Sequence, residues 1–323
     1  MSGSYSTQMS QSQWILCLSL PLECPLEFLP NNQINMASSY VLFMLSLSCL
    51  ASTTIALGGN FNTDFNILFG DSRANIQDGG SSMSLAMDKS SGSGIATKNE
   101  YLFGRFDMQI KLIPGNSAGT VTTFYLSSQG PNHDEIDLEF LGNLSGDPYI
   151  LSTNYYANGT GGREMQFYLW FDPTQDFHTY SIDWNTQRII ILVDNTPIRV
   201  MHNRESIRVP FPTSQPMKIY ATLWNGDFWA TRGGKVKIDW SKAPFISGFR
   251  NFNANACIAG PGASSCMGFN GGRNKGLDAQ IRKHLKEIHS RWVVYDYCRD
   301  FIRFAHGFPH DCRKNKQTLV TSH

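Results

Sequence analysis

Hydrophobic and polar residues alternate with a period of two along several segments between residues 61 and 240. The clearest of these segments are Arg105–Gly115, Thr120–Ser128, Arg188–Val200, Met217–Trp224 and Lys235–Trp240. Such alternation predicts half-buried strands, and the Pro-Gly and Asp-Asn-Thr-Pro sequences within them predict turns. Many short strands with no helical stretch between them indicate an all-β protein, either a sandwich or a jelly roll.

The pattern changes after Ser241–Phe245. The segment Asn253–Asn274 is rich in Gly, Asn, Ala and Ser, which predicts a loop. Five apolar residues then recur at helical spacing and predict one amphipathic helix that packs on the β domain: Leu277, Ile281, Leu285, Ile288 and Trp292. We therefore divide the chain into a leader (1–57), a β-rich domain (58–245) and a C-terminal extension (246–323).

The leader has the pattern of a secretory signal peptide. No Lys or Arg precedes Arg73, and the apolar run Tyr40–Leu50 is followed by small residues with Thr54-Ile55-Ala56 as a cleavage box. Met36 suits this signal as a start better than Met1. Eleven apolar residues are too few to span a bilayer, so we expect a secreted protein with no membrane association after cleavage.

Cysteine usage agrees with export, because the chain beyond the leader keeps an even set of four: Cys257, Cys266, Cys298 and Cys312. Four cysteines allow three connectivities. Local pairing in sequence order would close short loops and stabilise a region with a thin core. A four-ligand zinc site is the alternative, although the chain has no C-x-x-C pair.

The net charge of +1 gives no reason to expect a nucleic-acid partner. The sequence contains no G-x-S-x-G, H-E-x-x-H or Walker motif, and we predict neither a cofactor nor a metal site. Two N-glycosylation sequons begin at Asn143 and Asn158, which fits a secreted surface.

Three carboxylates occupy every second position of the segment HDEIDLEFLG, namely Glu135, Asp137 and Glu139. On a strand these carboxylates share one face, and the apolar residues between them point into a core. Two Glu side chains leaning together could reach the separation of roughly 5–5.5 Å that a retaining glycosidase needs, with the Asp between them tuning their protonation. The alternative is a solvated strand face. His133, next to the row, is interpreted as a turn residue.

Aromatic residues favour the glycosidase interpretation, since flat rings suit sugar faces as well as they suit cores. The candidates are Trp170, Phe171, Trp184, Trp224 and Trp229. For each of these residues, packing in the core is an equally good explanation.

Further motifs surround the carboxylate row, among them NEYLFGRFDMQIKLIPGNSAGTVTTFYLSS, SGDPYILSTN, REMQFYLWFDPTQDFHTYSIDWN, WATRGGKVKIDWSKAPF and RNFNANAC. Together with HDEIDLEFLGN they resemble the plant xyloglucan endotransglucosylase/hydrolases of glycoside hydrolase family 16. The resemblance covers about Gly59 to Cys257 and is weaker beyond. It implies a concanavalin-like β-jelly roll with an open cleft, followed by the C-terminal extension of that plant family.

The resemblance also implies roles for individual residues. Glu135 would be the nucleophile, Glu139 the acid/base and Asp137 the assisting carboxylate, while Asn143 takes the family's glycan position. The substrate contacts implied, besides Glu139, are Ser152, Thr153, Asn154, Gly162, Arg163, Glu164, Trp229, Gly233 and Arg303. Pairing of the cysteines in sequence order is also the family's pattern.

The implied activity is cleavage of the xyloglucan backbone with retention and transfer to a second xyloglucan chain, by a monomer in the plant cell wall or apoplast. The short loop Tyr155–Gly162 favours transfer, because the family's hydrolases tend to have an insertion there. The alternatives are an endohydrolase of xyloglucan or mixed-linkage glucan, and a non-catalytic lectin. An intact carboxylate row argues against the lectin.

The sequence departs from the family at three places. Leu138 replaces the usual Phe, Phe228 stands where an acid is more usual, and Arg291–Cys298 is shorter than the usual stretch. The shortening predicts a truncated strand near the acceptor end, close to the contact implied for Arg303.

Overall fold

The computed structural model describes residues 58–260, 266, 269 and 279–313. The predicted signal peptide, the start at Met36 and Leu277 of the predicted helix lie outside the described residues. So does most of the loop predicted beyond Ile258. Among the residues that are described, no helix is long and apolar enough to cross a bilayer.

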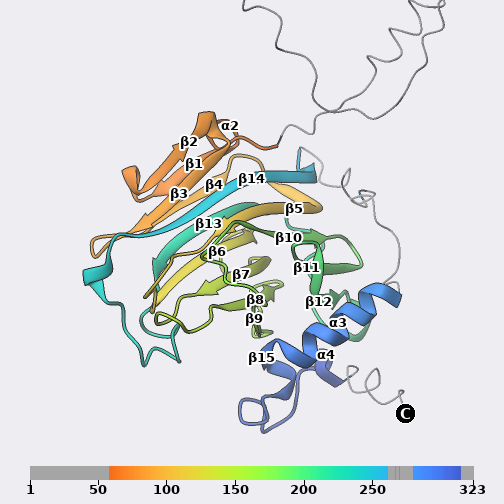
Figure 1. Cartoon of the computed structure of the whole chain (residues 1–323). Helices are drawn as coiled ribbons and strands as arrows, with labels where there is room; N and C mark the ends of the chain where they lie inside the picture. The colour runs from red at the N-terminus through yellow and green to blue at the C-terminus, as the bar shows by residue number, and fades with distance from the viewer. Residues whose placement is uncertain (1–57, 261–265, 267–268, 270–278, 314–323) are drawn as a thin grey trace, which may run out of the picture. The chain divides into compact units, whose positions relative to one another are not determined.

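The described residues form two antiparallel sheets that pack face to face (Figure 1). In spatial order, the eight-stranded sheet contains β1 (Phe65–Phe69), β4 (Ser93–Thr97), β13 (Lys218–Asn225), β6 (Thr120–Ser127), β7 (Glu135–Leu141), β8 (Ile150–Tyr156), β9 (Met165–Tyr168) and β15 (Val293–Asp296). The seven-stranded sheet contains β12 (Thr196–His202), β11 (Arg188–Val193), β10 (His178–Trp184), β5 (Tyr101–Lys111), β14 (Phe245–Ile258), β3 (Ser82–Met87) and β2 (Ala74–Gln77). This arrangement confirms the predicted all-β sandwich.

Helices are few in the described part of the chain. The α-helices are α2 (Phe61–Asp64), α3 (Ala279–Arg291) and α4 (His310–Arg313). Short 3₁₀ turns lie at Asp71–Arg73, Asp78–Gly80, Glu205–Ile207, Trp240–Lys242 and Tyr297–Arg299. The predicted amphipathic helix is confirmed as α3, which packs on β12 with Ile288 buried in the core.

The core lies between the two sheets, and the apolar face of β7 belongs to it. Ile136, Leu138 and Phe140 have no exposed surface, and the Phe140 ring meets Tyr180 of the facing sheet at 4.6 Å between centroids. Leu138, which stands where the resemblance leads us to expect Phe, is therefore fully buried. The alternation of β7 places every carboxylate of the row on the opposite face.

Two predictions from the pattern are wrong. Lys235–Trp240 alternates like a strand but forms no strand, and a 3₁₀ turn begins at Trp240. The backbone N–H of Ile238 donates to the Asp227 carboxylate at 2.7 Å instead of to the backbone of a neighbouring strand. The loop predicted from Asn253 begins later, since β14 continues to Ile258 and pairs there with β5. Cross-strand pairing there outweighs the weak strand propensity of Asn and Ala.

Both disulfides follow the local pairing, Cys257–Cys266 and Cys298–Cys312. The zinc alternative is therefore wrong. The stretch before Cys298, which was predicted to be short, forms a strand, β15, which pairs with β9 at three positions. The sheet thus continues into the C-terminal extension.

Candidate active site

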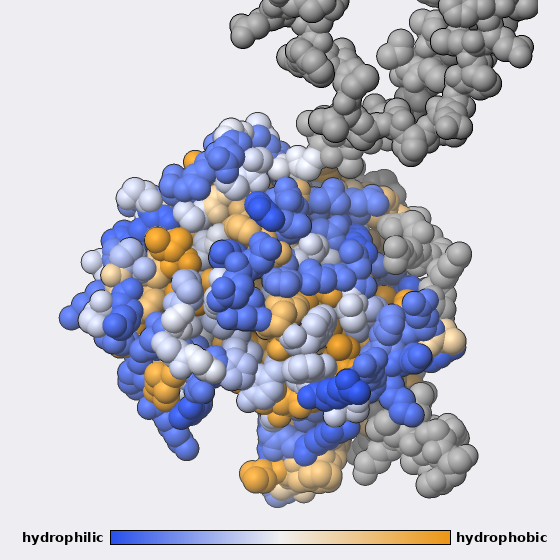
Figure 2. All heavy atoms as spheres, in the orientation of Figure 1, coloured by the Kyte–Doolittle hydropathy of each residue, from blue (hydrophilic) through white to orange (hydrophobic). Residues whose placement is uncertain are grey.

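A cleft of about 710 Å³ crosses the outer face of the eight-stranded sheet. Figure 2 shows this face hollowed between two projections, which Figure 1 identifies as the loop after β13 and the segment after β15. The lining residues are Thr123, Tyr125, Glu135, Asp137, Glu139, Ser152, Asn154, Tyr156, Glu164, Gln166, Thr222, Trp224, Phe228, Trp229, Tyr295 and Arg303. All three carboxylates of the row therefore lie in one cleft, as the strand pattern predicts.

Strand β7 holds the row in register from both sides. Each carboxylate has one partner on β6 and one on β8, in the order Ser127 and Tyr156 for Glu135, Tyr125 and Asn154 for Asp137, and Thr123 and Ser152 for Glu139. Partners directly opposite in an antiparallel pair share a face. The row is thus surrounded by hydroxyl, amide and phenol groups that can bond to sugar hydroxyls.

Burial and mutual repulsion raise the pKa values of two of the acids. The pKa of Asp137 lies well above its usual range, first because the side chain is buried and then because the charges of Glu135 and Glu139 are close. A hydrogen bond between Asp137 and Glu135 contributes in the same direction. Protonated Asp137 therefore donates to Glu135.

Glu139 is the second acid with a raised pKa. Burial, followed by the charges of Glu135 and Glu164, raises the pKa of Glu139 to about 7. A carboxyl group that keeps its proton near neutral pH can serve as a general acid. The row therefore places a proton donor two strand positions from Asp137 and four from Glu135.

His133 lies at one end of the row and is confirmed as a turn residue. Its Nδ1 lies 2.7 Å from the Gly130 carbonyl oxygen, and its ring packs on Tyr156 with 5.0 Å between centroids. Its Nε2 is 3.8 Å from a carboxylate oxygen of Glu135. The contact with Gly130 fixes the ring beside the row.

The first wall of the cleft is aromatic. Trp224 at the end of β13 and Phe228 and Trp229 in the following loop lie with their ring centroids 6.3 to 6.5 Å apart. Phe228 is 73% exposed. Of the other candidate aromatics, Trp184 is buried in the core and donates to the Pro212 carbonyl, so packing explains it.

The second wall comes from β9, β15 and the segment after β15. Arg303 donates to Glu164 at 2.5 Å, and Tyr295 donates to Asp300 at 2.8 Å. Glu164 also contributes to the raised pKa of Glu139. One carboxylate therefore links this wall to the acid row.

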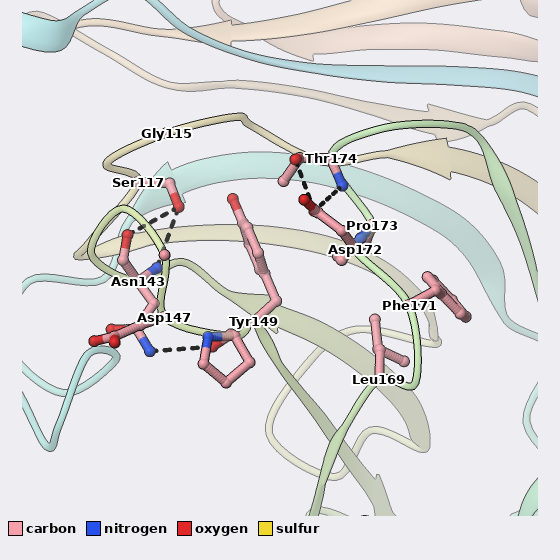
Figure 3. Close-up of a pocket in the computed structure, with 12 residues that line it drawn as sticks. Gly115, Ser117, Asn143, Asp147, Tyr149, Leu169, Phe171, Asp172, Pro173 and Thr174 are labelled. Atoms are coloured by element: carbon pink, nitrogen blue, oxygen red, sulfur yellow. Dashed lines mark hydrogen bonds between the residues drawn. The ribbon is translucent and has the colours of Figure 1, made fainter.

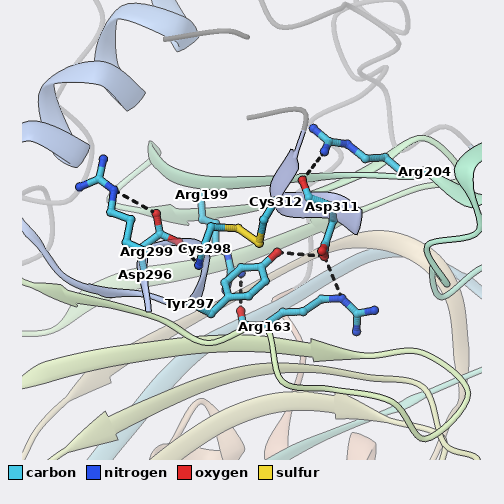
Figure 4. The surroundings of a disulfide bond; sticks show 9 residues. All are labelled: Arg163, Arg199, Arg204, Asp296, Tyr297, Cys298, Arg299, Asp311 and Cys312. Carbon is cyan, nitrogen blue, oxygen red and sulfur yellow. Dashed lines mark hydrogen bonds and ion pairs between the residues drawn. A yellow bond between two sulfur atoms is a disulfide. The ribbon is translucent and has the colours of Figure 1, made fainter. Parts of the chain in front are cut away.

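A buried polar network holds the second wall in place (Figure 4). The Asp311 carboxylate accepts hydrogen bonds from Arg163 at 3.1 Å and from the Tyr297 hydroxyl at 2.9 Å. Arg204 donates to the Asp311 carbonyl at 2.6 Å, and the Cys298–Cys312 disulfide lies beside these groups. The segment that carries Arg303 is thereby fixed to the chain between β8 and β9.

The structure brings most of the predicted contact residues into the cleft, but not all of them. Thr153, Gly162, Arg163 and Gly233 do not line it. Thr153 and Arg163 are buried and bond to the protein: Thr153 donates to the Met165 carbonyl, and Arg163 bonds to Asp311. A Cβ on Gly162 would stand 3.1 Å from Nη2 of Arg303, so this glycine leaves space for the arginine.

Several lining residues were not predicted from the sequence, notably Thr123, Tyr125, Tyr156, Gln166, Thr222 and Tyr295. Tyr125 and Thr123 occupy alternate positions of β6, and this alternation is the sequence pattern that could have identified them. The pattern identifies cleft residues only once the register of β6 with β7 is known. Tyr295 lies on β15, far along the chain from β7, and no local sequence pattern connects it to the acid row.

Asn143, the predicted glycan position, lines a smaller hollow of about 280 Å³ (Figure 3). Its side-chain amide donates to the Pro148 carbonyl at 3.1 Å, and Ser117 donates to the Asn143 carbonyl at 3.3 Å. Figure 3 also shows Tyr149, Leu169 and Phe171 around this hollow. The hollow is separate from the acid row.

A two-sheet fold with a row of closely spaced acids in an open cleft is typical of a carbohydrate-cleaving enzyme. Sequence comparison agrees: the family model "Glycosyl hydrolases family 16" matches residues 61–242 and "Xyloglucan endo-transglycosylase (XET) C-terminus" matches residues 264–312. The chain belongs to glycosyl hydrolase family 16, in its branch of xyloglucan endotransglucosylase/hydrolases.

Individual relatives support the same assignment. The chain is 56% identical over 279 residues to xyloglucan endotransglucosylase protein 1 of Diospyros kaki, covering 86% of this chain and 96% of that protein. It is 54% identical over 284 residues to the probable xyloglucan endotransglucosylase/hydrolase protein 16 of Arabidopsis thaliana, covering 85% and 97%. The structure of a laminarinase from Flavobacterium sp. UMI-01 shares the fold, with a TM-score of 0.50 and 18% identity over 61% of this chain and 95% of that one.

Proposed function

We propose that this protein cleaves the β-1,4-glucan backbone of xyloglucan with retention and transfers the glycosyl group to another xyloglucan chain. The observation that carries the proposal is the carboxylate row on β7, which lies in a cleft closed at one side by the C-terminal segment. The relatives named as xyloglucan endotransglucosylases cover nearly all of their own length in this match. Donor and acceptor are both xyloglucan chains.

Each carboxylate has one role in the proposed reaction. Glu135 attacks the anomeric carbon of a backbone glucose while Glu139 gives its proton to the leaving oxygen, and a glycosyl-enzyme forms. Asp137 holds the nucleophile by its hydrogen bond. Glu139, now a base, takes a proton from the acceptor hydroxyl, and the new glycosidic bond releases Glu135.

The second wall supports transfer over hydrolysis. A positioned sugar hydroxyl competes with water only if the protein holds it firmly. Arg303 and Tyr295 offer donors and a phenol to such an acceptor, and their positions are fixed by the network around Asp311. The loop Tyr155–Gly162 is short and closed by a bridge between Ala157 and Thr160.

Hydrolysis of xyloglucan or a mixed-linkage glucan is the second candidate, with water as the acceptor in the same cleft.

Sugar contacts in this proposal come from the lining residues Ser152, Asn154, Glu164, Trp229 and Arg303. Thr153 and Arg163 are buried and support these contacts from behind the cleft, and Gly162 leaves space for Arg303. The lectin alternative is set aside, because a binding protein gains nothing from three acids of like charge in one row.

We further propose a secreted, monomeric protein of the plant cell wall with a glycan on Asn143. The signal-like leader, the two disulfides and the sequon support this setting. The division of the chain at residues 57 and 245 is part of the same proposal, with the strand β14 that begins at Phe245 belonging structurally to the sandwich.

One assay tests the proposed function. The mature protein is incubated with polymeric xyloglucan, with and without a labelled xyloglucan oligosaccharide. Label entering the polymer supports transfer, and new reducing ends without incorporated label support hydrolysis. If neither appears, the enzyme assignment is wrong.

A further inference from the structure

An exposed aromatic residue lies beyond the cleft lining, at the far edge of the same sheet. Phe69 ends the edge strand β1, and this residue is 40% exposed. No hydrogen-bonded strand lies on the outer side of β1 in the described part of the chain. Packing in the core does not account for this ring.

Cross-strand register connects Phe69 to the acid row. Its partner on β4 is Gly94, and the successive partners across β13, β6 and β7 are Thr222, Thr123 and Glu139. Residues directly opposite in antiparallel strands have their side chains on the same face. Phe69 therefore lies on the cleft face, in the line that contains the acid/base.

The Phe69 ring packs on Gly94 of the neighbouring strand. A Cβ on this glycine would stand 2.5 Å from one ring carbon of Phe69 and 3.0 Å from the Thr222 methyl group, so the ring lies over the glycine and beside a residue that lines the cleft. Thr222 and Thr123 hydrogen-bond to each other through their hydroxyls at 2.6 Å. The floor between Phe69 and Glu139 is therefore built from two threonines and a glycine, all small.

Distance determines which part of a ligand could reach Phe69. Four strand steps separate it from Glu139, or roughly 19 Å at the usual spacing between strands. A pyranose in an extended β-1,4 chain is about as long as one strand step, so several sugars lie between the cleaved bond and Phe69. The position is at the end of the line opposite Tyr295 and Arg303, which is the donor end of the proposed reaction.

We propose that Phe69 forms a distal donor-side binding site, where its ring stacks on a backbone sugar several residues from the cleaved bond. This inference rests on the proposed function. The occupant is the polysaccharide chain already held in the cleft, because the row of small residues continues the cleft floor to the ring without interruption. Aromatic stacking on a sugar face needs an exposed flat ring and no charge, and Phe69 supplies it.

The test compares donors of two lengths in the full mature protein. For Phe69→Ala we expect the KM for polymeric xyloglucan to rise roughly three- to tenfold, with kcat unchanged. The KM for a xyloglucan oligosaccharide with too few donor-side backbone glucoses to reach Phe69 stays the same. Phe69→Trp, which keeps a flat ring, retains the low KM for the polymer.

Ile67→Ala is the matched control. Ile67 lies on the same strand with 46% exposure, but the register between β1 and β4 shifts between Ile67 and Phe69. The partner of Ile67 is Ile95, which is buried in the core, so Ile67 belongs to the other face. We expect no change in either KM for this variant. A rise in the polymer KM equal to that of Phe69→Ala would attribute the effect to the edge strand as a whole and overturn the proposal.

Binding separates this inference from the proposed function. The catalytically inactive Glu135→Ala protein is titrated with polymeric xyloglucan, with and without Phe69→Ala. Weaker binding of the double variant supports the distal site even if no transfer or hydrolysis is detected. Equal binding, or no binding by either protein, refutes it. A change in self-association on gel filtration with unchanged polymer binding would instead identify a second copy of the chain as the occupant.

Discussion

The acid row and the C-terminal wall face each other across one cleft but are held in place differently. Strand β7 is paired through seven register contacts with β6 and seven with β8. Strand β15 has three contacts with a single neighbour, and the rest of its support comes from side chains and a disulfide. The row is therefore fixed by backbone pairing on both sides, and the wall by a few specific groups.

This difference suggests a division of function. Backbone pairing is insensitive to most substitutions, so it suits the chemistry that every reaction cycle requires. The wall is built from replaceable contacts such as Arg163 with Asp311 and Arg303 with Glu164. In the proposed enzyme, bond cleavage depends on the row, while the choice of acceptor depends on the wall.

The largest expected effect comes from removing the nucleophile from the row. Glu135→Ala should lower both transfer and hydrolysis by roughly 10³-fold or more, because no covalent intermediate can form. The measurement is incorporation of labelled acceptor and release of reducing ends. Wild-type-like melting would show that the loss is chemical. Appreciable turnover by this variant would mean that another group is the nucleophile.

Loosening the second wall of the cleft should change the ratio of transfer to hydrolysis more than the overall rate. The double variant Cys298→Ser/Cys312→Ser removes the cross-link beside the Asp311 network, and the ratio of transfer to hydrolysis should fall roughly tenfold because the acceptor is less well positioned. Stability should fall by about 3 kcal/mol. Product ratio and thermal unfolding are measured together.

The matched control is Cys257→Ser/Cys266→Ser, which removes a disulfide whose cysteines are distant in sequence from Asp311 and, in the described part of the chain, make no bond to its network. It should lose stability and keep the product ratio. If both double variants alter the ratio equally, the wall has no special part in acceptor choice.

The pH dependence sharpens the contrast within the row. Cleavage needs protonated Glu139, whose pKa is raised to about 7, so kcat/KM should fall about tenfold per pH unit above that value. Because folding raises this pKa above 4.5, ionisation weakens the folded state as pH rises through the interval between 4.5 and about 7. Glu139→Gln should therefore melt higher than the wild type at pH 8, while being nearly inactive. An activity profile that stays flat from pH 6 to pH 9 would contradict the assignment.

The smallest expected effect concerns the exposed ring of the aromatic wall. Phe228→Asp introduces the acid that the family resemblance leads us to expect at this position. We expect a change in the KM for xyloglucan of about two- to fivefold with little change in kcat. Phe228→Leu separates loss of the ring from gain of the charge. Identical kinetics for all three proteins would show that this ring does not touch the substrate.

Local patterns predicted much of the first region and little of the second. Alternation along HDEIDLEFLG correctly placed the acids on one face and Ile136, Leu138 and Phe140 in the core. Helical spacing likewise placed Ile288 against the β domain. Each of these features depends on residues that are neighbours in sequence, so a short window contains the information.

What could not be predicted depends on long-range pairing. Asp311 meets Arg163 across 148 residues, and nothing local marks either residue as half of a pair. Lys235–Trp240 carries the strand pattern without a neighbouring strand, whereas Asn253–Ile258 lacks the pattern and is paired on one side by β5. Backbone hydrogen-bond partners, which sequence spacing does not reveal, determined both outcomes.

The pairing of β7 on both sides also limits how this cleft can change over evolution. Inserting or deleting one residue within the strand would shift its register by one, which would turn the acids toward the core and the apolar side chains toward solvent. A strand that is paired on one side, such as β15, is less constrained in length. The stretch Arg291–Cys298, for which the sequence predicts a shortening, lies at this edge strand, away from the acid row. The substrate range of this enzyme can therefore change through the length of segments at the sheet edges, whereas the acid row can change only by substitution of its residues.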